Sequence, residues 1–228
     1  MQKAAERAGR TVPALAACVA LLSVWVVLVR PGLPPVPRLV GGLVVAGCTV
    51  VLGLWAGLDA DGLGLSPRRL TDGLRYGGLA FVAVTVVILL GVAIPATREA
   101  FHSGRADITA GQLLVQVPLT IPLGTVVVEE LAFRGALLGL FRLTMPTSRA
   151  VVLCSVLFGL WHVPSVLAAT SGSDVRVVAA ATGTFVATFA AGVAFCWLRV
   201  RSGSLLAPAM AHLATNSVAL VAAWLVLH

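Results

Sequence analysis

Residues 125–139 read TVVVEELAFRGALLG, and this stretch decides how the whole chain is interpreted. It places Glu129, Glu130 and Arg134 inside an otherwise almost wholly apolar segment. A carboxylate near the centre of a bilayer costs at least ~2.5 kcal/mol on insertion scales, so such residues usually face a cavity or a partner and mark function. Two questions follow: whether the surrounding chain spans a membrane, and what holds the two carboxylates there.

The composition is that of an integral membrane protein. Of the 228 residues, 59% are hydrophobic and 11% are charged, whereas a soluble domain carries about 25% charge. The four cysteines lie in apolar segments and are interpreted as small buried hydrophobes, not as disulfides. The net charge of +7 comes from basic residues scattered between apolar segments. That pattern sets membrane orientation, so no nucleic-acid partner is expected.

Seven apolar segments are candidates for membrane spans, since a helix needs roughly 20 apolar residues to cross the hydrocarbon core. They are residues 12–29, 39–58, 76–95, 112–140, 150–169, 177–198 and 204–227. The fourth is long for one crossing and contains Pro118 and Pro122, so it is either kinked or broken into two helices. The predicted fold is an all-α polytopic bundle of about 7–8 transmembrane helices, one membrane domain over residues 1–228, with an intramembrane polar cavity.

The basic residues predict which end of the bundle is cytoplasmic. If the N-terminus is inside, the inner segments hold Lys3, Arg7, Arg10, Arg68, Arg69, Arg75, Arg142, Arg149, Arg199 and Arg201. The outer segments then hold Arg30, Arg38, Arg98, Arg105 and Arg176. The excess on the first side favours a cytoplasmic N-terminus. We therefore expect a multi-pass protein of the cell membrane, and the high content of Ala, Val, Leu and Gly is typical of a bacterial protein.

Helix geometry gives the two glutamates different roles. Glu130 and Arg134 are four residues apart, so they share a helix face and can pair. Glu129 points about 100° away from Glu130, and no cation lies three or four residues from it. Glu130 therefore has a local structural explanation, whereas Glu129 needs a partner from another helix.

Candidate partners for Glu129 lie in two later spans. His162 occurs in VLFGLWHVPSVL, where Phe158 shares its helix face, and His212 and Asn216 share a face in APAMAHLATNSVA. Glu129, His162 and His212 are each eleven to thirteen residues from a basic residue at the inner end of their spans, or roughly 16–20 Å at about 1.5 Å per residue. Three polar groups at one depth on three spans predict a site.

These residue types suit hydrolysis of an acyl bond by an activated water. Glu129 with His162 can hold and deprotonate a water, and N–H donors from His212 and Asn216 suit a developing oxyanion. The chain contains neither a G-x-S-x-G nor an H-E-x-x-H motif, which argues against a serine nucleophile elbow and a standard zincin. Two Glu and two His are also acceptable metal ligands, so a metal-dependent hydrolase stays open at this point.

Two further interpretations of the same residues are not enzymatic. The polar groups could form a latch between helices in a scaffold or immunity protein, with Asn216 bonding two helices together. They could also form a proton relay in a transporter, although groups at one depth do not make a path across the bilayer. The Trp, Phe and Met residues are interpreted as lipid-facing or packing residues.

Three short motifs carry a resemblance to a known family. EELAFR at 129–134, FGLWH at 158–162 and HLATN at 212–216 fit E-E-x-x-x-R, F-x-x-x-H and H-x-x-x-N. In this order, on separate apolar segments, they resemble the CPBP intramembrane proteases, which include type II CAAX prenyl proteases and bacterial proteins linked to bacteriocin processing or self-immunity. The resemblance covers about residues 111–220, the expected protease core. Residues 1–110 match only in being hydrophobic, and their helices have no assigned role.

The resemblance implies an intramembrane glutamic endopeptidase without metal or cofactor. In such an enzyme Glu129 and His162 activate the water, and His212 and Asn216 form the oxyanion hole. The supporting residues are Glu130, Arg134 and Phe158. The partners implied are the lipid bilayer and a peptide or protein substrate that enters from the membrane or the inner face. A CAAX substrate is not expected in a bacterium, where protein prenylation is not expected, and relatives typically have about eight spans.

Overall fold

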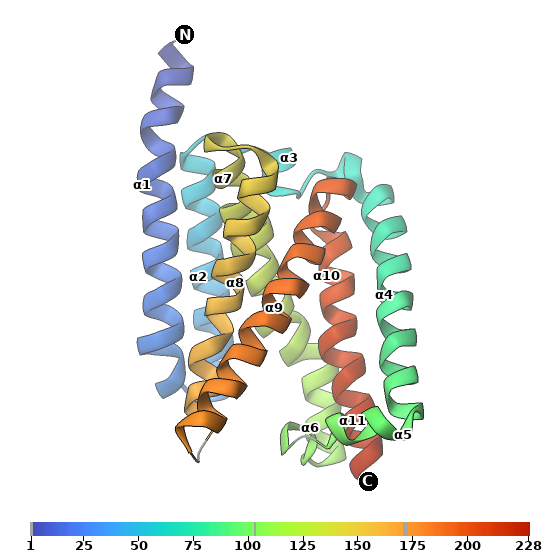
Figure 1. The fold of residues 1–228 in the computed structure, drawn as a ribbon. Coiled ribbons are helices and arrows are strands. Elements are labelled where there is room, and N and C mark those ends of the chain that lie inside the picture. The colour runs from blue at the N-terminus through green and yellow to red at the C-terminus, as the bar shows by residue number, and fades with distance from the viewer. Residues whose placement is uncertain (1, 103, 171–172) are drawn as a thin grey trace.

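The computed structural model describes residues 2–102, 104–170 and 173–228, and within these ranges every regular element is a helix. Seven helical segments of the described chain are long and apolar enough to cross a membrane. They are Gly9–Gly32, Pro35–Trp55, Pro67–Ala93, Ala110–Thr144, Thr147–Ala169, Asp174–Ser202 and Leu206–Leu227. The chain's two ends lie at opposite ends of the bundle (Figure 1), as an odd number of crossings requires. The predicted all-α polytopic bundle is confirmed.

The first two spans are joined by a tight connection. Helix α1 (Gln2–Val24) continues through a π-helical turn (Trp25–Val29) and a 3-10 turn (Arg30–Gly32). Helix α2 (Pro35–Trp55) starts with a proline, which suits a first helical position because the backbone N–H there has no intrahelical partner. The α1–α2 loop lies at the end of the bundle opposite the N-terminus (Figure 1).

The third span begins nine residues before the predicted start at residue 76. Short α3 (Ala60–Leu63) and a 3-10 turn (Pro67–Arg69) lead directly into α4 (Leu70–Ala93). The sequence pattern missed this start because Asp72 lies in the first turn of α4, where a half-exposed charge remains solvated at the membrane boundary. Beyond α4 come α5 (Pro95–Arg98) and two 3-10 turns, Glu99–Phe101 and Gly104–Ala106.

The fourth span is one irregular helix of 35 residues, not two helices. It consists of α6 (Ala110–Val115), π-helical segments at Gln116–Thr120, Pro122–Val127 and Glu130–Leu137, and α7 (Leu138–Thr144). Pro118 and Pro122 each lack a backbone donor, and the wider π turns keep the helix continuous across them. Such turns often occur at functional sites; Glu130 begins the third π-helical segment, and Glu129 immediately precedes it.

The last three spans bring the two predicted histidines toward this irregular helix. Helices α8 (Thr147–Ala169) and α9 (Asp174–Ser202) form a hairpin. The final span consists of α10 (Leu206–Leu213), a π turn (Ala214–Val218) and α11 (Ala219–Leu227). Figure 1 shows α10 beside α4, with α9 crossing the front of the bundle.

Glycines on α4 allow α10 to approach closely. Gly73 and Gly77 are buried and four residues apart, the spacing of small residues that lets membrane helices pack closely. A Cβ atom on Gly77 would lie 2.8 Å from Met210 Sδ and 3.0 Å from Ala207 Cα. The backbone of α10, which carries His212, is therefore held against α4.

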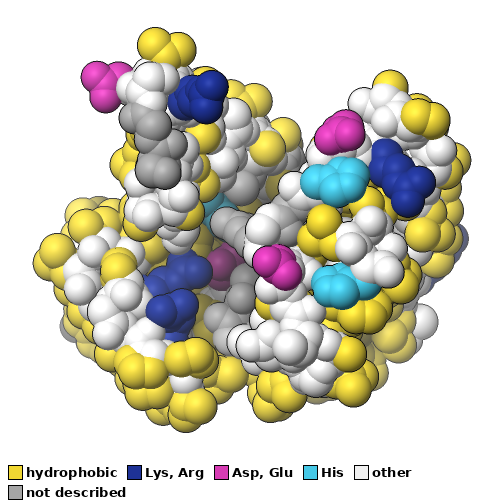
Figure 2. Space-filling model, turned by 90° about the horizontal axis from the view of Figure 1, so that it is seen from below, with side chains coloured by type: hydrophobic (Ala, Val, Ile, Leu, Met, Phe, Trp, Pro, Cys, Tyr) yellow, Lys and Arg dark blue, Asp and Glu magenta, His cyan; other side chains and the backbone are white. Residues whose placement is uncertain are grey.

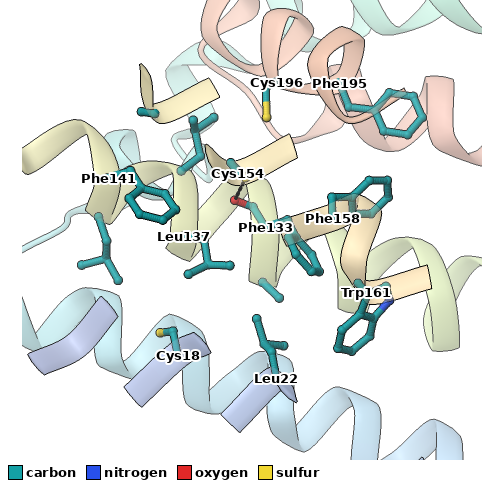
Figure 3. Close-up of a cluster of buried hydrophobic side chains, with 14 of the residues drawn as sticks. Cys18, Leu22, Phe133, Leu137, Phe141, Cys154, Phe158, Trp161, Phe195 and Cys196 are labelled. Carbon is teal, nitrogen blue, oxygen red and sulfur yellow. Dashed lines mark hydrogen bonds between the residues drawn. The ribbon is translucent and has the colours of Figure 1, made fainter. Parts of the chain in front are cut away.

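A buried cluster between α1, the fourth span, α8 and α9 forms the core (Figure 3). The ring of Phe133 makes edge-to-face contacts with Phe158 and Trp161, at centroid distances of 5.2 and 5.5 Å. The Cys154 thiol donates to the Phe133 carbonyl at 3.2 Å. All four cysteines are free thiols, as expected, although Cys48 is exposed rather than buried. This core fixes the helix faces that carry the polar residues.

Candidate active site

Glu129 lies at the centre of the polar cluster and is 5% exposed. Its Oε1 accepts a hydrogen bond from the indole Nε1 of Trp161 at 3.0 Å. Its Oε2 lies 3.7 Å from the Nε2 atom of His162 and 3.7 Å from the Nε2 atom of His212. These distances exceed that of a direct hydrogen bond, and Oε2 has no hydrogen-bond partner among the described residues. The expectation that Glu129 finds its neighbours on other helices is confirmed.

His162 is held in one tautomer by its own helix. Its Nδ1 lies 2.8 Å from the backbone carbonyl of Phe158. A carbonyl oxygen can only accept, so Nδ1 carries the proton, and Nε2 of the neutral ring is an acceptor. The Phe158 ring also meets the His162 ring edge-on at a centroid distance of 4.7 Å. The acceptor nitrogen is therefore directed toward Glu129 Oε2.

Glu130 and Arg134 form the predicted ion pair. Arg134 Nη1 donates to Glu130 Oε1 at 3.1 Å, and the two side chains are 0% and 2% exposed. The Arg134 guanidinium carbon lies 3.9 Å from the centre of the Phe158 ring and 5.0 Å from that of Phe195, which adds a cation–π contact away from water. The structure thus places all three predicted supporting residues, Phe158 included, in one buried group.

His212 connects the two glutamates. Its Nδ1 lies 2.8 Å from Glu130 Oε1, while its Nε2 faces Glu129 Oε2. Because an ionised carboxylate only accepts, Nδ1 is the donor in the contact with Glu130. The ring of Phe195 stacks on the imidazole with a centroid distance of 5.0 Å. Sequence spacing predicted the pair of Glu130 with Arg134, but it gave no sign of this second partner from the last span.

Asn216 is not drawn into the cluster. It lies in the π turn Ala214–Val218, is half-buried, and its amide makes no hydrogen bond within the described part of the chain. Both ring nitrogens of His212 are directed at carboxylates. The structure therefore brings together Glu129, His162 and His212, and leaves Asn216 outside their contacts. Within the described ranges, no group of three or more His, Cys, Asp or Glu side chains is arranged to hold a metal ion.

The three spans that carry these contacts coincide with a known family. Residues 111–218 match the family model described as type II CAAX prenyl endopeptidase Rce1-like. The chain carries an Rce1-like domain. The match confirms the resemblance to the CAAX protease-like family inferred from the three motifs, and it supports a peptidase. No curated protein and no solved structure matches the chain significantly.

Trp161 is the residue of the Rce1-like domain that sequence reasoning missed. It was interpreted as a packing or lipid-facing residue, but it is 5% exposed and its indole N–H is bonded to Glu129. A buried indole usually finds an acceptor for its N–H. Its place next to His162 in FGLWH was therefore the available signal, although the motif alone does not say which acceptor it meets.

Helices outside the Rce1-like domain complete a cavity beside Glu129. The cavity has a volume of about 180 Å³, and its walls come from the end of the first span, the start of α2, the fourth span and Trp161. Arg30 and Arg38 line it at the α1–α2 loop, and Glu129 lines its inner part. Figure 2 views this end of the bundle and shows a central hollow with Lys and Arg side chains beside it.

Proposed function

We propose that this protein is an intramembrane endopeptidase that hydrolyses a peptide bond with a water activated by Glu129. One observation carries the proposal: a buried carboxylate oxygen without a hydrogen-bond partner faces two imidazole nitrogens at 3.7 Å each. A water about 2.8 Å from Oε2 and from an Nε2 atom fits a separation of this size. The match to a family of endopeptidases supports peptide-bond chemistry over other uses of such a water.

Glu129 Oε2 and His162 Nε2, which both accept hydrogen bonds, orient the water for attack. In the proposed mechanism, Glu129 Oε2 accepts one water proton as the general base and His162 Nε2 accepts a hydrogen bond from the other. The water oxygen then attacks the carbonyl carbon of the substrate. Glu129 passes the proton to the leaving nitrogen, the carbon–nitrogen bond breaks, and the products are a carboxylic acid and an amine. Trp161 keeps Oε1 occupied, so Oε2 is the oxygen that acts.

The proposed role of His212 in an oxyanion hole depends on whether its Nε2 atom carries a proton. With Nδ1–H donated to Glu130, the neutral ring has only a lone pair at Nε2 and cannot donate to an oxyanion. Donation from Nε2 to an oxyanion therefore requires a proton on that nitrogen. For Asn216 to donate its amide N–H to the oxyanion, its side chain must move toward the cluster, either on its own or when a substrate binds.

Replacement of the general base tests the mechanism. The purified protein is incubated with a peptide library digested from a bacterial membrane proteome, and new termini are identified by mass spectrometry. Glu129→Gln is expected to lower the rate of product formation at least ~100-fold, the lower range for general-base catalysis, without a shift in thermal unfolding. Glu99→Gln, at a highly exposed glutamate, is the matched control. If Glu129→Gln forms products at the wild-type rate, Glu129 is not the general base.

A non-enzymatic latch is the second candidate, and one observation favours it. Glu130, Arg134 and His212 form a buried network that joins two spans without any substrate. That network explains Glu130, but it gives no reason for the unpartnered Oε2 of Glu129. In a latch protein, no new termini appear with wild type, and biological function survives Glu129→Gln.

The side from which a substrate enters depends on the orientation of the bundle. The protein is a multi-pass membrane protein, and the cavity is lined by residues on both sides of the α1–α2 loop, which lies at the end opposite the N-terminus. A cytoplasmic N-terminus and a cavity open to the inner face are therefore incompatible expectations. We retain the cytoplasmic N-terminus, because the basic residues favour it, and propose that substrates enter from the membrane or from the outer face.

A further inference from the structure

The cavity beside Glu129 has charges of opposite sign at its two ends. Arg30 lies in the 3-10 turn that ends the first span, and Arg38 lies in the first turn of α2. Both guanidinium groups belong to residues that line the same cavity as Glu129. Neither lies in the Rce1-like domain, which begins at residue 111. The N-terminal helices thus contribute two arginines to a cavity whose lining also includes Glu129, the proposed general base.

Contacts fix where the two guanidinium groups lie relative to Glu129. The Arg30 guanidinium carbon lies 5.9 Å from the centre of the Trp161 ring, and the same indole donates its N–H to Glu129. Arg30 and Glu129 are therefore neighbours of one side chain. Arg38 Nη2 donates to the Leu33 carbonyl at 2.6 Å, which ties the Arg38 side chain to the α1–α2 loop. The exposed Arg38 side chain is thus anchored at the loop, and both arginines share the lining of one cavity with Glu129.

We propose that Arg30 and Arg38 form an anion subsite that binds a carboxylate of the peptide substrate. Two arginines bind a carboxylate through several charge-assisted hydrogen bonds. The charge on Glu129 repels the same carboxylate, so a bound peptide is oriented with its anionic group at the α1–α2 loop and its backbone toward Glu129. The subsite rests on the proposed peptidase function and gives it a specificity: peptides with a free C-terminal carboxylate or an acidic side chain near the cleaved bond.

A lipid phosphate is the competing use of arginines at a membrane boundary. Arg38 is exposed and Arg30 is half-buried, but both line a cavity that also reaches Glu129 and Trp161, which headgroup binding alone does not require. For this reason the substrate carboxylate is favoured. The lipid alternative predicts binding of anionic vesicles without any preference among peptides, and the experiment below includes that outcome.

Binding of matched peptides tests the subsite without relying on catalysis. The Glu129→Gln protein is placed in phosphatidylcholine nanodiscs, and fluorescently labelled apolar peptides are titrated by anisotropy. The peptides form three sets: free C-terminal carboxylate, C-terminal amide, and amide with one internal Glu. The carboxylate or Glu peptides are expected to bind at least ~10-fold tighter than the plain amides, a difference of about 1.4 kcal/mol. The set that binds tighter identifies the source of the carboxylate.

Arginine variants show whether that preference comes from the subsite. Arg30→Gln and Arg38→Gln should remove the preference and leave the affinity for amides unchanged. Arg30→Lys with Arg38→Lys should retain part of it, and Arg176→Gln, at an exposed arginine of α9, should retain all of it. Absence of any preference, absence of binding by every peptide, or an equal loss for carboxylates and amides overturns the subsite. If the Arg30 and Arg38 variants lose binding to phosphatidylglycerol vesicles but keep the wild-type peptide affinities, the subsite is also overturned, and the arginines bind lipid headgroups instead.

The subsite and the peptidase function can fail separately. If the carboxylate preference is found but the wild-type protein releases no new termini from the peptide library, the anion subsite stands and the hydrolytic mechanism fails. If the wild-type protein cleaves peptides without regard to their anionic groups, the hydrolytic mechanism stands and the anion subsite fails.

Discussion

The indole Nε1 of Trp161 lies 3.0 Å from Oε1 of Glu129, so only Oε2 of that carboxylate is left to face the two histidines. Both residues are 5% exposed. A carboxylate with one oxygen fixed has a single orientation, which is what a general base needs if its other oxygen is to meet a water in the same position in every molecule. Trp161 is therefore a positioning residue in the proposed mechanism.

Trp161→Phe should lower kcat and change KM little. The phenyl ring keeps the packing against Phe133, but the hydrogen bond to Glu129 is lost. A hydrogen bond to a charged group contributes about 1.5–3 kcal/mol, so we expect kcat to fall roughly 10- to 100-fold. Steady-state kinetics on a cleaved peptide measure both constants. Trp197→Phe, at a side chain that is 56% exposed, is the control and should keep the wild-type kcat. An unchanged kcat in Trp161→Phe would assign Trp161 to packing alone.

Arg134→Met should destabilise the protein strongly. The substitution leaves the Glu130 carboxylate buried without its cation, and breaking a buried ion pair in this way costs about 3–5 kcal/mol of unfolding free energy. Thermal unfolding in detergent should show a clear drop in the midpoint. The double variant Glu130→Gln with Arg134→Met should recover part of the loss, because no charge is then left unpaired.

An exposed ion pair provides the comparison for Arg134. Arg69 and Asp72 are also separated by a short helical spacing, with N···O at 3.7 Å, but their side chains are 55% and 50% exposed. Pairs of this kind contribute about 0–1 kcal/mol, so Arg69→Met should leave the midpoint nearly unchanged. Equal effects of Arg69→Met and Arg134→Met would contradict the structural role assigned to the buried pair.

Helical spacing predicted contacts within one span much better than contacts between spans. The seven spans and the pairing of Glu130 with Arg134 follow from hydrophobic length and from the distance between residues on one helix. The bond from Trp161 to Glu129 depends on the rotation of α8 about its axis, which sequence spacing does not specify. The bond from His212 to Glu130 depends likewise on the depth of the last span.

Asn216 also shows that helical spacing does not predict which side chains act together. Its spacing from His212 placed both on one helix face, but the helix widens into a π turn at Ala214–Val218, and the His212 nitrogens face the glutamates instead. A four-residue spacing indicates a shared face, and it does not show that two side chains act on one atom. The role of Asn216 in an oxyanion hole therefore stays a prediction.

Gly77→Ala should destabilise the packing of α4 on α10. The added methyl would lie 2.8 Å from Met210 Sδ and 3.0 Å from Ala207 Cα, and a backbone atom cannot move aside as a flexible side chain can. Overpacking of this kind typically costs about 1–3 kcal/mol, measured as a lower midpoint of thermal unfolding. Gly78→Ala is the neighbouring control, because a Cβ there meets no atom within 4 Å. A similar loss in both variants would mean that helix packing is not the cause.

A topology measurement decides on which side of the membrane the cavity lies. The ten basic residues on the N-terminal side predict a cytoplasmic N-terminus, and the odd number of spans then puts both the α1–α2 loop and His228 outside. A C-terminal fusion to alkaline phosphatase should be active, and a fusion to a fluorescent protein that folds only in the cytoplasm should be dark. A fusion made instead after Met145, between the fourth and fifth spans, should reverse both results. The opposite pattern would put the arginine-lined end of the cavity in the cytoplasm, so that substrates would enter from the inner face and the excess of basic residues would lie outside.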